Sequence, residues 1–334
     1  MKIKIFGTMA AAIAAVGLVA AGPAQAKVKR LTIGSNPAGS VYFLLAGGFA
    51  KLFQQELKLR STAQPHAGSS VYLPLMDKGE ITLGLNSSLD SGMAFNGKVP
   101  FRQRHLGVKS LARVWILPYG YMTKETSGIK TIADLKGKRV VIKFKTNVSL
   151  GQLNRTILST AGLSPSDVVE LESGGVVAGI NMVVEGRADA VTVATGMPAM
   201  RKAHATVPGG LRMVALLPQT TDREMASGMP GSRTFMAKPN KRYGFIRGKT
   251  KIAAFDTFLN AGTSIDNEDA YTLTKTLHTN WKKLQKSYGP IRGTPQQGMA
   301  PPTNPMPYHA GAIKYWKDAG LWTAANDKQQ GSLK

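Results

Sequence analysis

"RLTIGSNPAGSVYFLLAGGFAKLFQQEL" (residues 30–57) joins a short apolar strand to an amphipathic helix through a glycine-rich turn. Apolar residues recur in it at helical spacing, which predicts a helix that begins near Ser40. They are Val41, Leu44, Leu45, Gly48, Phe49, Leu52 and Phe53. The turn lacks the Gly-Lys-Ser/Thr end of a P-loop and the spacing of a dinucleotide fingerprint. It therefore predicts either a backbone cradle for an anion or a plain turn.

Strand, glycine turn and helix recur along the chain, which predicts an α/β fold with mostly parallel strands. The expected strands include "ITLGLNSS" (81–88), "KRVVIKF" (138–144) and "ADAVTVAT" (188–195). A weak repeat supports two similar lobes. In both copies, which start at Gly68 and Gly175, a short helix ends at a glycine, Gly79 or Gly186, and a strand follows.

Two extended runs, 112–124 and 246–262, predict that the chain crosses between the lobes twice. The first lobe is then discontinuous, 27–117 plus 250–334, and the second is continuous, 118–249. Helical patterns at 267–286 and 307–322 complete the first lobe.

Residues 1–26 have the pattern of an export signal. Lys2 and Lys4 precede a short apolar core, and "AQA" places cleavage after Ala26. No later stretch approaches the length of a membrane span. We expect a periplasmic protein.

The chain carries 43 Lys and Arg against 19 Asp and Glu, a formal charge of +24, and has no cysteine. The basic residues are spread along the chain with no nucleic-acid-binding signature, so this charge favours encounter with small anions over nucleic acid. The absence of cysteine excludes disulfides and thiol catalysis.

No catalytic set is visible in the sequence. The five histidines stand singly: His66, His105, His204, His278 and His309. No two of them have metal-ligand spacing, and no nucleophile has an adjacent base. We expect no enzyme activity, no metal and no cofactor.

Small polar residues stand at three predicted helix starts: 40–42, 68–71 and 147–149. Unpaired amides and the helix dipole make such starts suitable for anions. Serine and asparagine are also the preferred N-caps of ordinary helices, so each start alone fits both interpretations.

Five segments in order resemble the solute-binding proteins of TAXI-type TRAP transporters. They are "LTIGSNPAGSVYFLLAGGFAKLF", "HAGSSVYLPLMDKGEITLGL", "SGIKTIADLKGKRVVI", "VVEGRADAVTVATGMPA" and "HAGAIKYWKDAGLW". The resemblance implies a two-lobed type II periplasmic-binding-protein fold with a central cleft and two hinge crossovers, which closes on a small organic anion.

Carried over by position, the resemblance implies ligand contacts from Ser35, Asn36, Ser40, Val41, Tyr42, Ser69, Ser70, Ser87, Ser88, Thr195 and Gly196. Where the family has "G-S-G-T", this sequence has "NVSL" (147–150), so Asn147 and Ser149 keep polar side chains and Leu150 replaces the threonine. The nearby Lys143, Lys145 and Arg155 either compensate with charge or are simply solvated.

The sequence thus predicts a monomeric exported receptor that captures a carboxylate or acidic amino acid and delivers it to the small and large TRAP membrane subunits. One alternative is the same fold serving an ABC importer for a sulfonate, phosphonate or pyrimidine precursor. Another is an exported basic protein that binds anionic surfaces.

Overall fold

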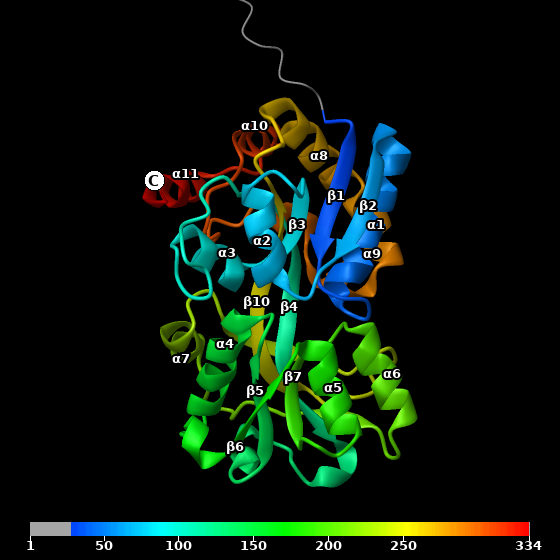
Figure 1. Ribbon diagram of the computed structural model, residues 1–334, viewed down its shortest axis with the longest axis vertical. Helices are drawn as coiled ribbons and strands as arrows, with labels where there is room; N and C mark the ends of the chain where they lie inside the picture. The colour runs from blue at the N-terminus through cyan, green and yellow to red at the C-terminus, as the bar shows by residue number, and fades with distance from the viewer. Residues whose placement is uncertain (1–27, 334) are drawn as a thin grey trace, which may run out of the picture.

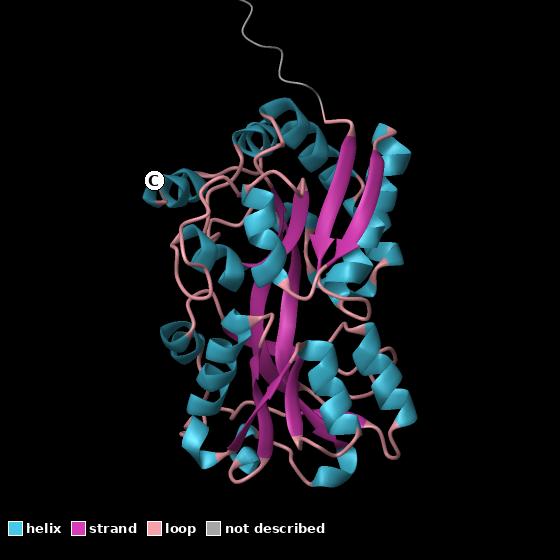
Figure 2. Cartoon of the chain, in the orientation of Figure 1, coloured by secondary structure: helices cyan, strands magenta, loops and turns pink. Residues whose placement is uncertain are grey.

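The computed structural model describes residues 28–333, which form two lobes stacked end to end (Figure 1). The predicted export signal lies outside the described residues. Helices cover the strands of each lobe, and two long strands run between the lobes (Figure 2).

The upper lobe in Figure 1 contains the N-terminal units and the C-terminal helices. Its elements are β1 (Arg30–Ser35), α1 (Val41–Leu57), β2 (Arg60–Pro65), α2 (Ser69–Asp77), β3 (Leu83–Ser87), α3 (Ser88–Phe95), α8 (Asn267–Thr279), α9 (Trp281–Ser287), α10 (Ala310–Asp318) and α11 (Ala324–Ser332). The prediction for α1 is confirmed: the Ser40 hydroxyl caps it by accepting a hydrogen bond from the Phe43 amide.

The lower lobe repeats the same order of strands and helices. Its elements are β5 (Arg139–Phe144), α4 (Val148–Ser159), β6 (Val169–Ser173), α5 (Val176–Val184), β7 (Ala190–Ala194), α6 (Pro198–Thr206), β8 (Leu211–Met213), α7 (Asp222–Gly228) and β9 (Arg233–Ala237). The order β2-β1-β3 in the upper lobe matches β6-β5-β7 in the lower one, and all four of these pairings are parallel.

The internal repeat is confirmed by backbone geometry. Gly79 after α2 has φ +78° and Gly186 after α5 has φ +76°. Only glycine adopts this left-handed conformation without strain, which is why both short helices stop at that residue.

Strands β4 (Lys109–Lys124) and β10 (Thr250–Ala261) join the lobes. They pair antiparallel with each other, and β4 continues into the lower lobe to pair with β7 and β8. The sheet is therefore mixed, not mostly parallel as the sequence suggested, because the hinge strands run against their neighbours. The lobe boundaries at 117/118 and 249/250 stay a prediction.

The tail differs from the sequence pattern in one place. The run 267–286 divides at Asn280 into α8 and α9. Trp281 can then turn inward, where its indole N–H donates to the carbonyl oxygen of Thr294. Among residues 28–333, none of the helices combines the length and the hydropathy that a membrane span requires.

Candidate functional site

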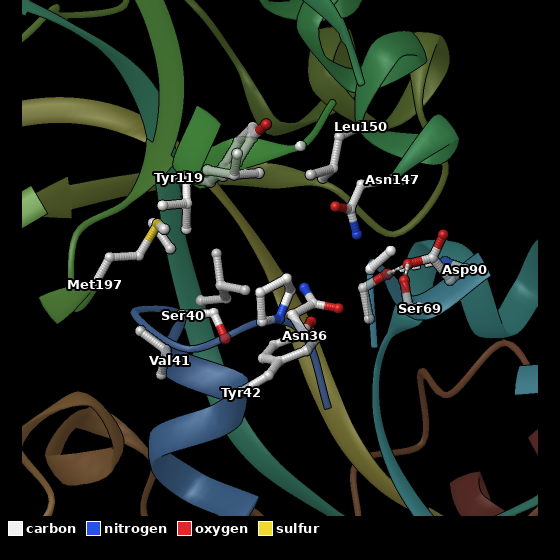
Figure 3. A pocket seen from close by; sticks show the side chains of 18 of the residues that line it. Asn36, Ser40, Val41, Tyr42, Ser69, Asp90, Tyr119, Asn147, Leu150 and Met197 are labelled. Atoms are coloured by element: carbon white, nitrogen blue, oxygen red, sulfur yellow. Dashed lines mark hydrogen bonds between the residues drawn. The ribbon is translucent and has the colours of Figure 1, made fainter. Parts of the chain in front are cut away.

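A cavity of about 280 Å³ lies between the two lobes (Figure 3). Six helices begin at it, α1 to α3 from the upper lobe and α4 to α6 from the lower one. This convergence follows from the fold, because the carboxyl ends of the parallel strands in the two lobes face each other across the gap. The lining residues are Asn36, Pro37, Ser40, Val41, Tyr42, Ala67, Ser69, Ser87, Asp90, Trp115, Leu117, Tyr119, Asn147, Leu150, Gly174, Gly175, Val176, Val177, Ala178, Ala194, Met197 and Phe255. We call this space the interlobe cavity.

Much of the interlobe cavity wall is apolar or aromatic. Trp115, Leu117 and Tyr119 come from β4 and Phe255 from β10, and each is almost completely buried. Leu150 on α4 faces the cavity from the other lobe (Figure 3). The wall can therefore enclose the apolar body of a small ligand.

The opening turn supplies the polar side of the upper lobe. The Tyr42 hydroxyl lies 3.2 Å from the Thr257 hydroxyl, and its ring meets Trp115 edge-on. Burial raises the pKa of Tyr42 well above its usual value, so it stays neutral. Asn36 lines the cavity, and its buried side-chain oxygen has no hydrogen-bond partner among the described residues. This oxygen is available to a donor on a ligand.

Asp90 is the one carboxylic acid among the described lining residues. Its carboxylate accepts hydrogen bonds from the hydroxyls of Ser69, Ser87 (2.9 Å) and Ser149 (2.5 Å). Ser149 belongs to α4, so this last bond joins the two lobes. Burial raises the pKa of Asp90, and the three serine hydroxyls oppose that rise because they stabilise the charged form.

The raised pKa of Asp90 predicts how the stability of the protein depends on pH. Because its pKa is raised in the folded state, the folded protein holds this proton at pH values where the unfolded chain, with a pKa of about 4, has lost it. The contribution of Asp90 to stability is therefore greatest below about pH 4 and falls as the pH rises through its folded-state pKa. Urea unfolding measures the free energy of unfolding of the wild type and of Asp90→Asn from below about pH 4 to above the folded-state pKa of Asp90. The wild-type value minus the Asp90→Asn value should fall as the pH rises. A difference that is constant or rises with pH would contradict the assignment.

The structure brings together part of the expected ligand set. Seven expected residues line the interlobe cavity: Asn36, Ser40, Val41, Tyr42, Ser69, Ser87 and Asn147. Ser149 reaches it only through Asp90. Their role in binding stays a prediction.

Five expected residues lie elsewhere. Ser35 is fully buried and donates to the carbonyl oxygens of Asn36 and Gln64, while Ser70 and Ser88 are not among the lining residues. Thr195 and Gly196 line a different cavity, because Gly196 packs closely between Val41 and Pro290.

The cations suggested as compensation do not reach the interlobe cavity. Lys143 and Arg155 both pair with Glu170, Arg155 at 3.5 Å, and Lys145 is exposed and does not line the cavity. Among the described lining residues, none is Lys, Arg or His. Any negative charge on a ligand would be met by helix amides and not by a cation.

Sequence reasoning missed Asp90 and the wall from the hinge strands. A local signal for Asp90 existed, since Ser87 and Asp90 have the spacing of a capping box and the Ser87 hydroxyl does accept from the Asp90 amide. The wall residues Trp115, Leu117, Tyr119 and Phe255 carried no such signal, because their meeting depends on the pairing of β4 with β10.

Comparison with known proteins identifies the family. A model of the NMT1-like family matches residues 33–320, which is most of the chain. The chain belongs to the NMT1-like family. A search of curated proteins found no match to this NMT1-like protein.

Two solved structures share the fold of the NMT1-like chain. One, described as a periplasmic transporter, is 13% identical with a TM-score of 0.53 over 91% of this chain and 95% of the other. The second, from Bordetella bronchiseptica, is 16% identical with a TM-score of 0.51 over 91% and 98%. The NMT1-like chain has the two-lobed type II periplasmic-binding-protein fold that the sequence predicted.

Proposed function

We propose that this protein is an exported solute-binding receptor that closes on a small organic anion in the interlobe cavity and delivers it to a membrane importer. The observation that supports it is the convergence of six helix starts from two lobes on one apolar-walled cavity. The receptor binds its solute without chemical change.

The helix starts and the apolar wall of the interlobe cavity indicate the class of ligand. Unpaired amides in the first turns of α1 and α5, together with the helix dipoles, favour one negative head group. The apolar wall of Trp115, Leu117, Leu150 and Phe255 favours an apolar body. We therefore propose a small carboxylic acid with an apolar body, whose head group faces the helix starts away from Asp90.

Closure follows from differential affinity. A ligand that touches α1 from one lobe and α5 from the other makes all of its contacts only when the cleft is closed. Its binding energy therefore shifts the population to the closed state, which is the form that a membrane partner would recognise.

Two membrane partners fit this proposal. The motif resemblance favours the TRAP pair of small and large subunits, and the ABC importer of an organic anion is the alternative. Neighbouring genes distinguish the two partners. Genes for a small and a large TRAP subunit indicate the first, and genes for a permease and an ATPase indicate the second.

Thermal unfolding of ligand-free protein tests the proposal. We expect at least one small carboxylic acid with an apolar body to raise the unfolding temperature, by a stabilisation of about 2.7 kcal/mol at about 100 times its Kd, and the matching amide to have no comparable effect. If no acid shifts the transition, the receptor proposal fails. If acid and amide shift it equally, the anion assignment fails while the cleft assignment stands.

A matched pair of variants locates the binding. Ala178 is exposed on α5 and lines the interlobe cavity. Ala178→Phe should therefore fill the opening of this cavity and raise the Kd of the acid at least about tenfold. Ala205 is exposed on α6 and does not line it, so Ala205→Phe should leave Kd unchanged. Equal effects of the two variants would place the ligand outside the interlobe cavity.

A further inference from the structure

A second cavity, of about 730 Å³, lies at the hinge, and we call it the hinge cavity. It shares Trp115 with the interlobe cavity, but its other walls are different. They come from β4, the end of β9, the loop that follows β9, the turn at 195–196 after β7, and the 3₁₀ turn Gly289–Gly293 after α9. In Figure 1, α6 and α9 lie on the same side of the molecule, and a smaller adjoining pocket is lined from both regions, by Arg201 of α6 and Ser287 of α9.

The rim of the hinge cavity is strongly cationic. Lys238, Lys241, Arg242 and Arg292 line it, and Arg201 joins Arg242 in the adjoining pocket. No Asp or Glu is among the described lining residues of either space.

Among residues 28–333, these five cations have no acidic partner. In the part of the chain that the structure describes, no ion pair involves any of them. Other arginines of this chain do find acids: Arg113 and Arg233 share Asp256, and Arg212 and Arg247 share Glu125. The cluster at the hinge cavity thus carries a concentrated positive charge that the protein itself does not neutralise.

Part of the cluster is held in place by the backbone. The Arg292 guanidinium donates to the carbonyl oxygens of Gln285 (3.0 Å) and Lys286 (3.1 Å). Arg242 packs so closely on Gly289 that a Cβ there would lie 2.0 Å from its guanidinium nitrogen. Burial raises the pKa of Tyr243, and the positive charges of Arg242, Arg201 and Arg292 oppose that rise.

The floor of the hinge cavity is apolar and partly aromatic. Trp115, Phe235, Tyr243, Ile246 and Pro290 contribute to it. Tyr243 also stacks on Phe245, which fixes its ring. An apolar floor below a rim of arginine and lysine matches a ligand with a flat apolar body and an anionic head, since a guanidinium group can donate two parallel hydrogen bonds to two oxygens of one oxyanion.

We propose that the hinge cavity is a second binding site, for a small organic oxyanion with an apolar body and a sulfonate, phosphate or carboxylate head. Such a ligand would contact Thr195 and Gly196 from the lower lobe and the 289–293 turn from the upper lobe at once. This site is separate from the interlobe cavity and does not depend on the solute proposed there.

Isothermal titration calorimetry at physiological ionic strength tests the site with three probes. Naphthalene-2-sulfonate has both the apolar body and the charge, naphthalene-2-sulfonamide has the body without the charge, and inorganic sulfate has the charge without the body. We expect naphthalene-2-sulfonate to bind at least about tenfold more tightly than either of the others. Equal binding of the sulfonamide would overturn the proposal, as would equal binding of sulfate.

Two double variants test whether the cations at the rim of the hinge cavity bind the probe. Lys241→Gln/Arg242→Gln removes two exposed cations from the hinge cavity and should weaken naphthalene-2-sulfonate at least about tenfold. Lys98→Gln/Arg102→Gln removes one exposed lysine and one exposed arginine far along the chain and should leave its Kd within about twofold. Equal losses in both pairs would mean attraction by overall charge and would overturn the site.

A third variant tests whether naphthalene-2-sulfonate binds in the interlobe cavity instead of the hinge cavity. Ala178→Phe, which narrows the interlobe cavity, should not change binding of naphthalene-2-sulfonate. If this variant abolishes binding while Lys241→Gln/Arg242→Gln does not, the probe binds in the interlobe cavity and the hinge site is overturned.

Discussion

Gly68→Ala is expected to hold the two lobes apart and to weaken solute binding by about 10- to 100-fold. A Cβ at Gly68 would lie 1.9 Å from the carbonyl oxygen of Thr146. Gly68 caps α2 in the upper lobe and Thr146 precedes α4 in the lower lobe, so the clash crosses the cleft. Because the contact is with backbone, rotation of a side chain cannot relieve it, and the lobes must separate.

The effect should be on closure and not on folding. Gly68 has φ −179°, an extended conformation that alanine also adopts, so the substitution adds no backbone strain. We expect each lobe to stay folded, with an unfolding transition close to that of the wild type.

Small-angle X-ray scattering in the presence of the acid that gives the largest thermal shift measures closure directly. The radius of gyration of Gly68→Ala should stay at its ligand-free value while that of the wild type decreases. Gly47→Ala is the control, because Gly47 is exposed on α1, lines neither cavity, and a Cβ there would meet no atom within 4 Å. Compaction of Gly68→Ala equal to that of the wild type would show that the lobes do not meet at this contact.

Trp316→Ala should lower the free energy of unfolding by about 3–5 kcal/mol. Trp316 on α10 is completely buried, and its indole N–H donates to the Leu111 carbonyl of β4 at 2.9 Å. Its ring packs edge-on against His278 of α8, with ring centroids 5.1 Å apart. The substitution leaves a large cavity and an unpaired buried carbonyl where the C-terminal helices meet the hinge strand.

Urea denaturation of Trp316→Ala beside Trp322→Ala checks this. Trp322 is half-buried and its indole N–H donates to the exposed Asp327 at 2.8 Å, so its loss should cost about 1 kcal/mol. If the two variants lose equal stability, the C-terminal helices are not anchored through Trp316.

Much of the fold was visible in the sequence because it is encoded locally. The helix after Ser40 follows from apolar residues at helical spacing. Its N-cap is a serine, a residue common at this position because its hydroxyl can accept a hydrogen bond from a free amide of the first turn. The repeat of the lobes was visible in two glycines that end short helices, since both need a left-handed backbone.

The site was only partly visible. Helix starts can be read from local patterns, and seven of the residues expected from them or from the motif resemblance do line the interlobe cavity. Thr195 and Gly196 also follow a strand, but they line the hinge cavity, because the close packing of Gly196 between Val41 and Pro290 places them there. Position along the chain could not predict that contact.

Local sequence patterns were enough to predict most strands and helices and their repetition in two lobes, because these elements depend on residues that are close together in the chain. The tertiary structure alone decided which groups meet. Pairing of β4 with β10 builds the apolar wall, and the contact between the lobes places Ser149 against Asp90. It also decided which charges meet: Lys143 and Arg155 share Glu170, whereas the cations around Tyr243 gather at the hinge cavity with no acidic partner among the described residues. These contacts join residues far apart in the chain, so no local spacing encodes them.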